Sequence, residues 1–138
     1  MSIKYDANSL GLMSSFEQLT HSKLKDFFEM GETYVFVVEP FQLRKALGER
    51  GANVKRLKEK LNKRVKIVEY SLDLESFVKN LIYPLKTSSF SYIDNVITLE
   101  GVDTQTKGLL IGRNAQNLRA YEKAVQRYFS EVKEIKIV

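Results

Sequence analysis

The residues that could do chemistry in this chain gather between Gln42 and Lys66, here called the basic segment. It holds ten Lys or Arg side chains and two Asp or Glu, a local net charge of +8, whereas the whole chain carries only +5. The remainder is therefore acidic, with a net charge of −3. Such focused basicity is typical of a surface that binds a polyanion such as a nucleic acid. The alternative is a lysine-rich helix face that only keeps the chain in solution.

Gly48 and Gly51 lie in the middle of the basic segment and predict a tight turn between two helices. Before the turn, apolar residues at three- and four-residue spacing form one face of a helix: Leu43, Ala46 and Leu47. Gly48 ends that helix because glycine adopts left-handed backbone angles without steric cost. The apolar face of a second helix follows Gly51, formed by Val54, Leu57 and Leu61. The turn brings backbone N–H groups and the positive end of the second helix to one exposed point, which favours phosphate binding.

Composition excludes several classes of protein. With 138 residues, 43% of them apolar, the chain can bury the core of one domain or of two small ones. It has no cysteine and a single histidine, His21, so we expect neither disulfides nor a metal site. It has no nucleotide-binding or catalytic motif, so we expect no catalytic residues, no cofactor and no enzyme activity. Without a signal-like start or an apolar run of ~18 residues, we expect a cytoplasmic protein that does not enter a membrane.

The expected secondary structure has the same order twice. The first copy comprises a short helix capped by Ser14 or Ser15, strands at 23–28 and 33–38, the two helices around the turn, and a strand at 64–70. The second copy comprises a helix capped by Asp73, strands at 86–92 and 95–99, helices at 104–111 and 116–129 around a turn at 112–115, and a strand at 132–138. Both copies therefore have the order α-β-β-α-α-β.

Similar residues at matching positions support an internal repeat. Ser15-Phe16 and Leu24-Lys25 recur 61 residues later, as Ser76-Phe77 and Leu85-Lys86. Leu47-Gly48 and Asn53-Val54-Lys55 recur 64 residues later, as Ile111-Gly112 and Asn117-Leu118-Arg119. We expect the hairpin loops to absorb the difference of three residues, because loop length drifts most easily. The prediction is an α+β protein with a leader at 1–12 and two tandem domains at 13–71 and 72–138.

A Gly-x-x-Gly turn between two helices, framed by strands, resembles the KH domain, and this element order resembles its type II form. Two such domains in tandem resemble the KH pair of the NusA family of transcription factors. In its length, and without a polymerase-binding N-terminal domain or an S1 domain, the pair is most similar to the archaeal NusA proteins. The resemblance covers residues 12–138.

This resemblance implies that the chain binds single-stranded RNA, with each turn against the RNA backbone and about four nucleotides across the domain. In the first domain it implies RNA contacts by Leu47, Gly48, Glu49, Arg50, Gly51, Asn53, Lys55 and Arg56. In the second it implies contacts by Ile111, Gly112, Arg113, Asn114, Ala115, Gln116, Asn117 and Arg119. The two asparagines would reach the RNA, and Lys55 and Arg119 would support phosphates. RNA polymerase and its nascent transcript are further implied partners, in transcription elongation, termination or antitermination.

Two residues depart from the pattern of the family. Glu49 places a carboxylate in a turn that should face phosphate, and we expect it to repel RNA. Ala115 stands where the closing glycine is expected, and it adds a methyl group close to the RNA backbone. We expect Ala115 to adopt ordinary helical angles, so that the turn survives as the start of a helix. Neither domain has an ideal turn.

Two other functions fit parts of the pattern. Residues 41–61 match a helix-turn-helix, in which the helix from Ala52 to Leu61 would enter the major groove of DNA. The flanking strands, the repeat and the tightness of the glycine turn weigh against this interpretation. A second alternative is a module that docks on RNA polymerase and has little affinity for RNA, against which the focused charge argues weakly.

Overall fold

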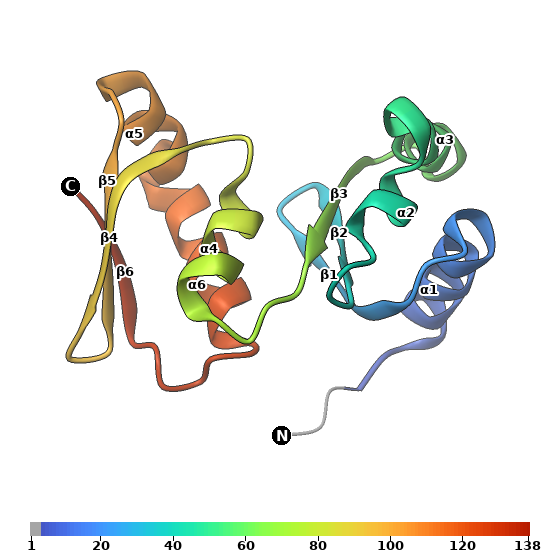
Figure 1. Ribbon diagram of the computed structural model, residues 1–138, viewed down its shortest axis with the longest axis horizontal. Coiled ribbons are helices and arrows are strands. Elements are labelled where there is room, and N and C mark those ends of the chain that lie inside the picture. The colour runs from blue at the N-terminus through green and yellow to red at the C-terminus, as the bar shows by residue number, and fades with distance from the viewer. Residues whose placement is uncertain (1–3) are drawn as a thin grey trace. The chain divides into compact units, whose positions relative to one another are not determined.

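The α-β-β-α-α-β order occurs twice in the computed structural model, which describes residues 4–138 (Figure 1). The first unit consists of α1 (Ala7–Thr20), β1 (Leu24–Met30), β2 (Thr33–Val38), α2 (Leu43–Leu47), α3 (Ala52–Leu61) and β3 (Arg64–Glu69). The second consists of α4 (Leu74–Ile82), β4 (Thr87–Ile93), β5 (Val96–Gly101), α5 (Thr104–Ile111), α6 (Gln116–Gln126) and β6 (Glu134–Ile137). The chain divides between Ser71 and Leu72. The predicted α+β fold, with two tandem copies of one order, is confirmed.

Each unit has a three-stranded sheet in which the second strand is central. β2 pairs with β1 in antiparallel and with β3 in parallel orientation, and β5 pairs with β4 and β6 in the same way. Parallel neighbours need a crossover connection, and in each unit this crossover is a helix, a turn and a second helix. The helices of each unit lie on one face of its sheet (Figure 1). The glycine turn is thus the midpoint of a crossover whose two ends are fixed by the sheet.

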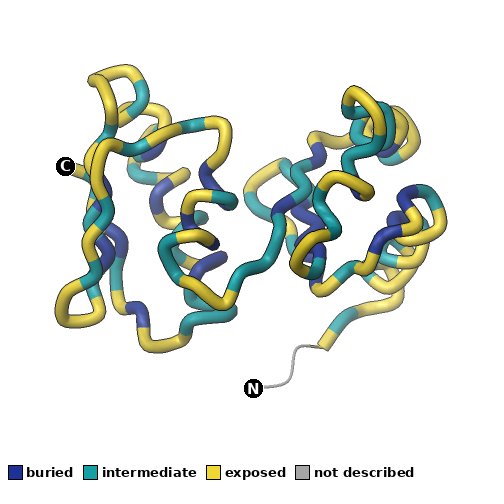
Figure 2. Tube along the Cα trace, in the orientation of Figure 1, coloured by how far each residue is buried: buried dark blue, intermediate teal, exposed yellow. Residues whose placement is uncertain are grey.

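Aromatic rings and the crossover helices build the core of the first unit. The rings of Phe16 and Phe36 stack with their centroids 4.5 Å apart, and the ring centroid of Phe27 lies 5.0 Å from that of Phe36. Ala46 from α2 and Leu57 from α3 complete this cluster, and both are fully buried. Buried residues follow the inner faces of the helices and the strands in Figure 2, whereas the hairpin tips are exposed. Burial of one residue on each side of the turn holds the turn in place.

The predicted leader at 1–12 was wrong where the structure describes it. Helix α1 already begins at Ala7, capped by Asp6, whose side chain accepts a hydrogen bond of 2.7 Å from the backbone N–H of Ser9. Leu12 and Met13 pack against the core of the first unit, and this packing stabilises a helix that the polar residues around them do not favour. Residues 1–3 of the predicted leader lie outside the described residues, and neither Ser14 nor Ser15 caps the helix.

The hairpin loops do not absorb the length difference between the copies. Both hairpins turn through two residues, 31–32 and 94–95, and both carry a bulge at the start of the first strand. The strands are therefore related by an offset of 63, and Leu24 corresponds to Thr87 rather than to Leu85. Register and turn geometry fix the length of a two-residue hairpin, so the extra residues lie instead in the connections between helices and strands.

The last helix and strand are shorter than the sequence predicts. α6 ends at Gln126 and not at residue 129, although the backbone N–H groups of Tyr128 and Phe129 both still donate to the carbonyl of Val125, in a tightened last turn. The side chain of Gln126 donates hydrogen bonds to the carbonyl groups of Val132 and Lys133, at 3.1 and 3.2 Å. These bonds hold the connection to β6, which begins at Glu134.

None of the helices within residues 4–138 has the length and apolar character needed to cross a lipid bilayer.

Lys66 on β3 shows that alternation along a strand does not mean that every second residue is solvated. It pairs in register with the fully buried Val35 and shares a sheet face with Val68, which is 1% exposed. Removal from water disfavours its ammonium charge and lowers the pKa of Lys66 to about 8, from 10.5.

The pH dependence of stability should report this burial. Between about pH 8 and 10.5 the unfolded chain keeps a proton on Lys66 that the folded chain has lost, so the free energy of unfolding should rise with pH in this window. Lys66→Met should raise stability at pH 7 and flatten the curve. Lys136→Met is the matched control, since Lys136 is exposed at the equivalent position of β6, and it should change stability by no more than about 0.5 kcal/mol. Urea denaturation across this pH range measures both, and equal effects of the two substitutions would contradict the assignment.

Candidate nucleic-acid interface

The first glycine of each turn is required by its backbone and by a close neighbour. Gly48 has φ 76° and ψ 172°, and Gly112 has φ 74° and ψ 176°. This extended region with positive φ is open essentially to glycine alone, and it differs from the left-handed helical angles predicted for Gly48. A Cβ atom on Gly48 would lie 2.8 Å from Cγ of Asn53, and one on Gly112 would lie 2.7 Å from Cγ of Asn117. The Gly-x-x-x-x-Asn spacing is thus a packing requirement.

The two asparagines connect the helices on either side of the turn. Nδ2 of Asn53 donates to the backbone carbonyl of Lys45 at 3.3 Å, and Nδ2 of Asn117 donates to that of Leu109 at 2.9 Å. Each bond ties the start of the second helix to the end of the first. Sequence reasoning assigned both side chains to RNA and missed this structural role. Their occurrence in both copies, five residues after the glycine, was the available signal.

Two consecutive residues with left-handed backbone angles close each turn. Arg50 has φ 55° and Gly51 has φ 72°, and the equivalent residues Asn114 and Ala115 have φ 54° and φ 59°. The turn is closed by a hydrogen bond from the N–H of residue 51 to the carbonyl of residue 48, 3.2 Å long, and by its counterpart of 3.3 Å in the second unit. The prediction that Ala115 adopts ordinary helical angles was wrong, because this closure requires positive φ whichever residue is present.

The structure brings the predicted RNA-contacting residues of each unit together around its turn. In the first unit they lie at the end of α2, in the turn and in the first half of α3: Leu47, Gly48, Glu49, Arg50, Gly51, Asn53, Lys55 and Arg56. In the second they lie at the end of α5, in the turn and in the start of α6: Ile111, Gly112, Arg113, Asn114, Ala115, Gln116, Asn117 and Arg119. Among the charged members, Glu49, Arg50, Lys55, Arg56, Arg113 and Arg119 are all exposed.

Backbone N–H groups are less available at the turn than the sequence suggested. The N–H of Gly51 donates to Gly48, and the N–H of Ala52 donates to Glu49. These two groups therefore complete the turn and cannot also donate to a phosphate without breaking it. The positive potential at the first turn then comes chiefly from the exposed side chains of Arg50, Lys55 and Arg56, together with the N-terminal end of α3.

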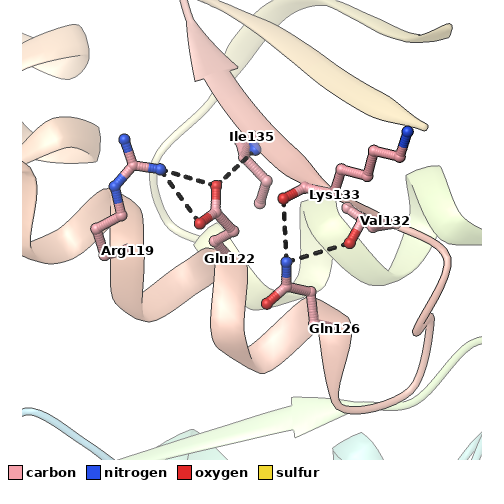
Figure 3. A network of polar contacts seen from close by, with 6 residues as sticks. All are labelled: Arg119, Glu122, Gln126, Val132, Lys133 and Ile135. Atoms are coloured by element: carbon pink, nitrogen blue, oxygen red, sulfur yellow. Dashed lines mark hydrogen bonds and ion pairs between the residues drawn. The ribbon is translucent and has the colours of Figure 1, made fainter. Parts of the chain in front are cut away.

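The helices that follow the two turns differ in charge although the turns share a backbone. In the second unit, Arg119 forms an ion pair of 3.0 Å with Glu122, whose carboxylate also accepts the backbone N–H of Ile135 at 2.9 Å (Figure 3). The equivalent positions of the first unit, 64 residues earlier, are Lys55 and Lys58. A neutral pair thus stands where the first unit has two cations. Residues 106–136, the counterpart of the basic segment, hold seven Lys or Arg and three Asp or Glu, a net charge of +4.

Comparison with known proteins gives this chain several relatives. No family model matches it. It is 30% identical over 142 positions to a probable transcription termination protein NusA of Methanococcus vannielii, a match that covers the whole chain and 81% of the relative. A protein of the same name from Thermoplasma acidophilum is 28% identical over 131 positions, which are 93% of this chain and 91% of the relative. The crystal structure of APE1850 matches 97% of this chain and all of that chain, with 26% identity and a TM-score of 0.73.

Exchanging the closing residues of the two turns should change stability in opposite directions. Gly51→Ala should lower the free energy of unfolding by roughly 0.5–1 kcal/mol, because left-handed angles cost alanine about 1–2 kcal/mol and the stiffer unfolded chain offsets only part of this. A Cβ atom at Gly51 meets nothing within 4 Å, so no clash adds to the effect. Ala115→Gly should raise stability by a similar amount.

The control for this pair is Gly108→Ala, in the interior of α5, where a Cβ atom also meets nothing within 4 Å. There alanine should stabilise the chain by roughly 0.5–1 kcal/mol, since the backbone angles are ordinary. Urea denaturation of the full-length variants measures all three changes. A loss of stability in Ala115→Gly would show that the closing residue is not strained.

Proposed function

This chain belongs to the archaeal NusA family of transcription termination proteins, and on that basis we propose that it acts in transcription termination by binding single-stranded RNA at its two glycine turns. The observation that best supports RNA binding is the position of the first turn within the basic segment. Gly48 and Gly51 leave the backbone of this turn without side chains at two of four positions, so that a phosphodiester backbone can approach closely. Exposed cations on α3 then neutralise phosphates on either side.

We assign most of the affinity to the first unit. Its basic segment carries +8, whereas the counterpart in the second unit carries +4. Lys55 and Lys58 face solvent without the carboxylate that engages Arg119 in the second unit. Ala115 also adds a methyl group where Gly51 has none. The second unit then binds fewer phosphates.

The relatives are named as probable transcription termination proteins. We propose the nascent transcript as the natural RNA and RNA polymerase as the protein partner. Titration against single-stranded RNA, duplex RNA and duplex DNA tests this assignment. Preference for the single strand supports it, preference for duplex DNA would favour the helix-turn-helix alternative, and weak binding to all three would favour a module that only docks on the polymerase.

Reversing the charges beside the first turn should weaken RNA binding regardless of RNA sequence. We expect Arg50→Glu combined with Lys55→Glu to lower affinity and to flatten the slope of log affinity against log salt by about 0.7 for each phosphate that the variant no longer neutralises. Fluorescence anisotropy with short single-stranded RNAs over a series of salt concentrations measures both quantities. The matched control, Lys4→Glu combined with Lys86→Glu, makes the same charge change at exposed positions outside residues 42–66 and 106–136 and should leave the slope nearly unchanged. Equal slopes for parent and turn variant would mean that the basic segment only solvates the chain.

Substitutions inside the first turn should separate folding from binding. Glu49→Lys replaces an exposed carboxylate that faces the phosphates, so it should tighten binding and leave the melting temperature nearly unchanged. Gly51→Asp adds a side chain and a second carboxylate beside Glu49, so it should weaken binding, while aspartate tolerates left-handed angles and should cost about 1 kcal/mol or less in stability. Melting temperature and RNA affinity are measured together. Unfolding by Gly51→Asp, or unchanged affinity in Glu49→Lys, would make this turn a structural cap rather than a binding site.

A further inference from the structure

Phe41 combines two features that folding alone does not favour. Its side chain is 93% exposed, which is the largest exposure among the large apolar residues that the structure describes. Its backbone has φ 67°, a left-handed angle that is rare for a bulky side chain. The other non-glycine residues with positive φ within residues 4–138 are small, polar or charged: His21, Arg50, Asn62, Asp94, Asn95, Asn114 and Ala115. Phe41 thus places an aromatic ring in water at a strained position.

Hydrogen bonds to other segments of the same chain fix the backbone around Phe41. One oxygen of the Glu69 carboxylate accepts the N–H of Phe41 at 3.1 Å and the N–H of Leu43 at 3.4 Å. Gln42 donates its N–H to the carbonyl of Glu39 at 3.1 Å, and its side-chain oxygen accepts the N–H of Lys23 at 2.9 Å. These bonds link the segment before α2 to β3 and to the start of β1. The ring is therefore presented by an ordered backbone, which lowers the entropy lost when a ligand orders it.

The surroundings of Phe41 favour a nucleic acid over a protein as the ligand. Arg44 and Lys45 follow in α2, and both are exposed. Lysine is depleted at the centres of protein interfaces, whereas cations beside an exposed ring are the usual combination at sites for single-stranded nucleic acids. Phe41 and Gly48 lie at opposite ends of α2, about 10 Å apart at a helical rise of about 1.5 Å per residue. A strand of about four nucleotides that contacts the glycine turn can extend over this distance.

We propose that Phe41 is a stacking platform for an unpaired base of the RNA strand whose backbone contacts the first glycine turn. This role rests on the RNA binding proposed above. The contacts proposed there involve only phosphates, and stacking on Phe41 adds a contact with a base. The second unit offers no equivalent, since the connection from β5 to α5 consists of Val102 and Asp103. The base is therefore bound by the first unit alone.

Removal and replacement of the ring test this role. Phe41→Gly removes the ring while glycine fits the positive φ, so the fold should be unharmed. We expect affinity for short single-stranded RNA to fall by at least about five-fold, the lower end of the effect at stacking sites. The salt slope should stay unchanged because no charge is removed. Phe41→Trp should retain affinity, and because the natural chain has no tryptophan, its fluorescence reports on this site alone and should be quenched when RNA binds.

Leu72→Trp is the control for fluorescence, because Leu72 is 84% exposed and lies outside the first unit. Its signal should respond little to RNA. Unchanged affinity in Phe41→Gly, or no quenching in Phe41→Trp at saturating RNA, would overturn the stacking role. If the charge reversals at Arg50 and Lys55 still weaken binding in that case, RNA binding at the turn stands and only the role of Phe41 fails. A parent chain that binds no single-stranded RNA would overturn both.

Discussion

Parallel pairing of the central strand with the last strand is the constraint on which each unit depends. A tight hairpin cannot join parallel strands, so the chain must leave β2, cross the face of the sheet and return beside it as β3. Ala46 and Leu57 hold the two halves of this crossover on the core, where both are fully buried. With both halves held, the residues between them must reverse direction over a very short distance. Positive φ angles make that reversal possible, and they determine where glycine is needed.

The two units show that backbone shape and surface charge are set independently. The turns have nearly the same angles because the same packing and the same asparagine hydrogen bond hold them. Side chains outside the packed turns have no such constraint, and there the copies differ: the exposed Lys58 in one unit corresponds in the other to Glu122, whose side chain is only 13% exposed. Glu122 neutralises Arg119 and also binds the backbone of β6, so it stabilises the second unit at the expense of positive potential. A duplicated scaffold thus carries two surfaces of unequal charge.

The residues that hold the first turn differ from those that its surface presents to a ligand. Gly48 and Asn53 pack closely against each other, and Asn53 also bonds to the backbone of Lys45. Substitutions at either residue therefore affect folding and binding together. Glu49, Arg50 and Phe41 are exposed, and their side chains make little contribution to the core. The strained angle at Phe41 is maintained by Glu69, a residue that is distant in sequence. Strain held by a remote side chain and displayed on the surface is more often a feature of binding sites than of scaffolds.

The sequence alone determined the fold class, the duplication and the position of both turns. Local signals suffice for these. A run of β-branched and aromatic residues predicted β2 at Thr33–Val38, α5 was predicted at Thr104–Ile111 with the observed bounds, and the repeated Gly-x-x-x-x-Asn spacing located the turns. Tertiary structure decided the start of α1, the offset of 63 between the strands, and the left-handed angles of Ala115. It also decided the exposure of Phe41 and the partial burial of Lys66. The Ala115 angles follow from closure of a turn whose two helices are held on the core. The others depend on contacts between residues distant in sequence, and such contacts override the preference of the residue itself.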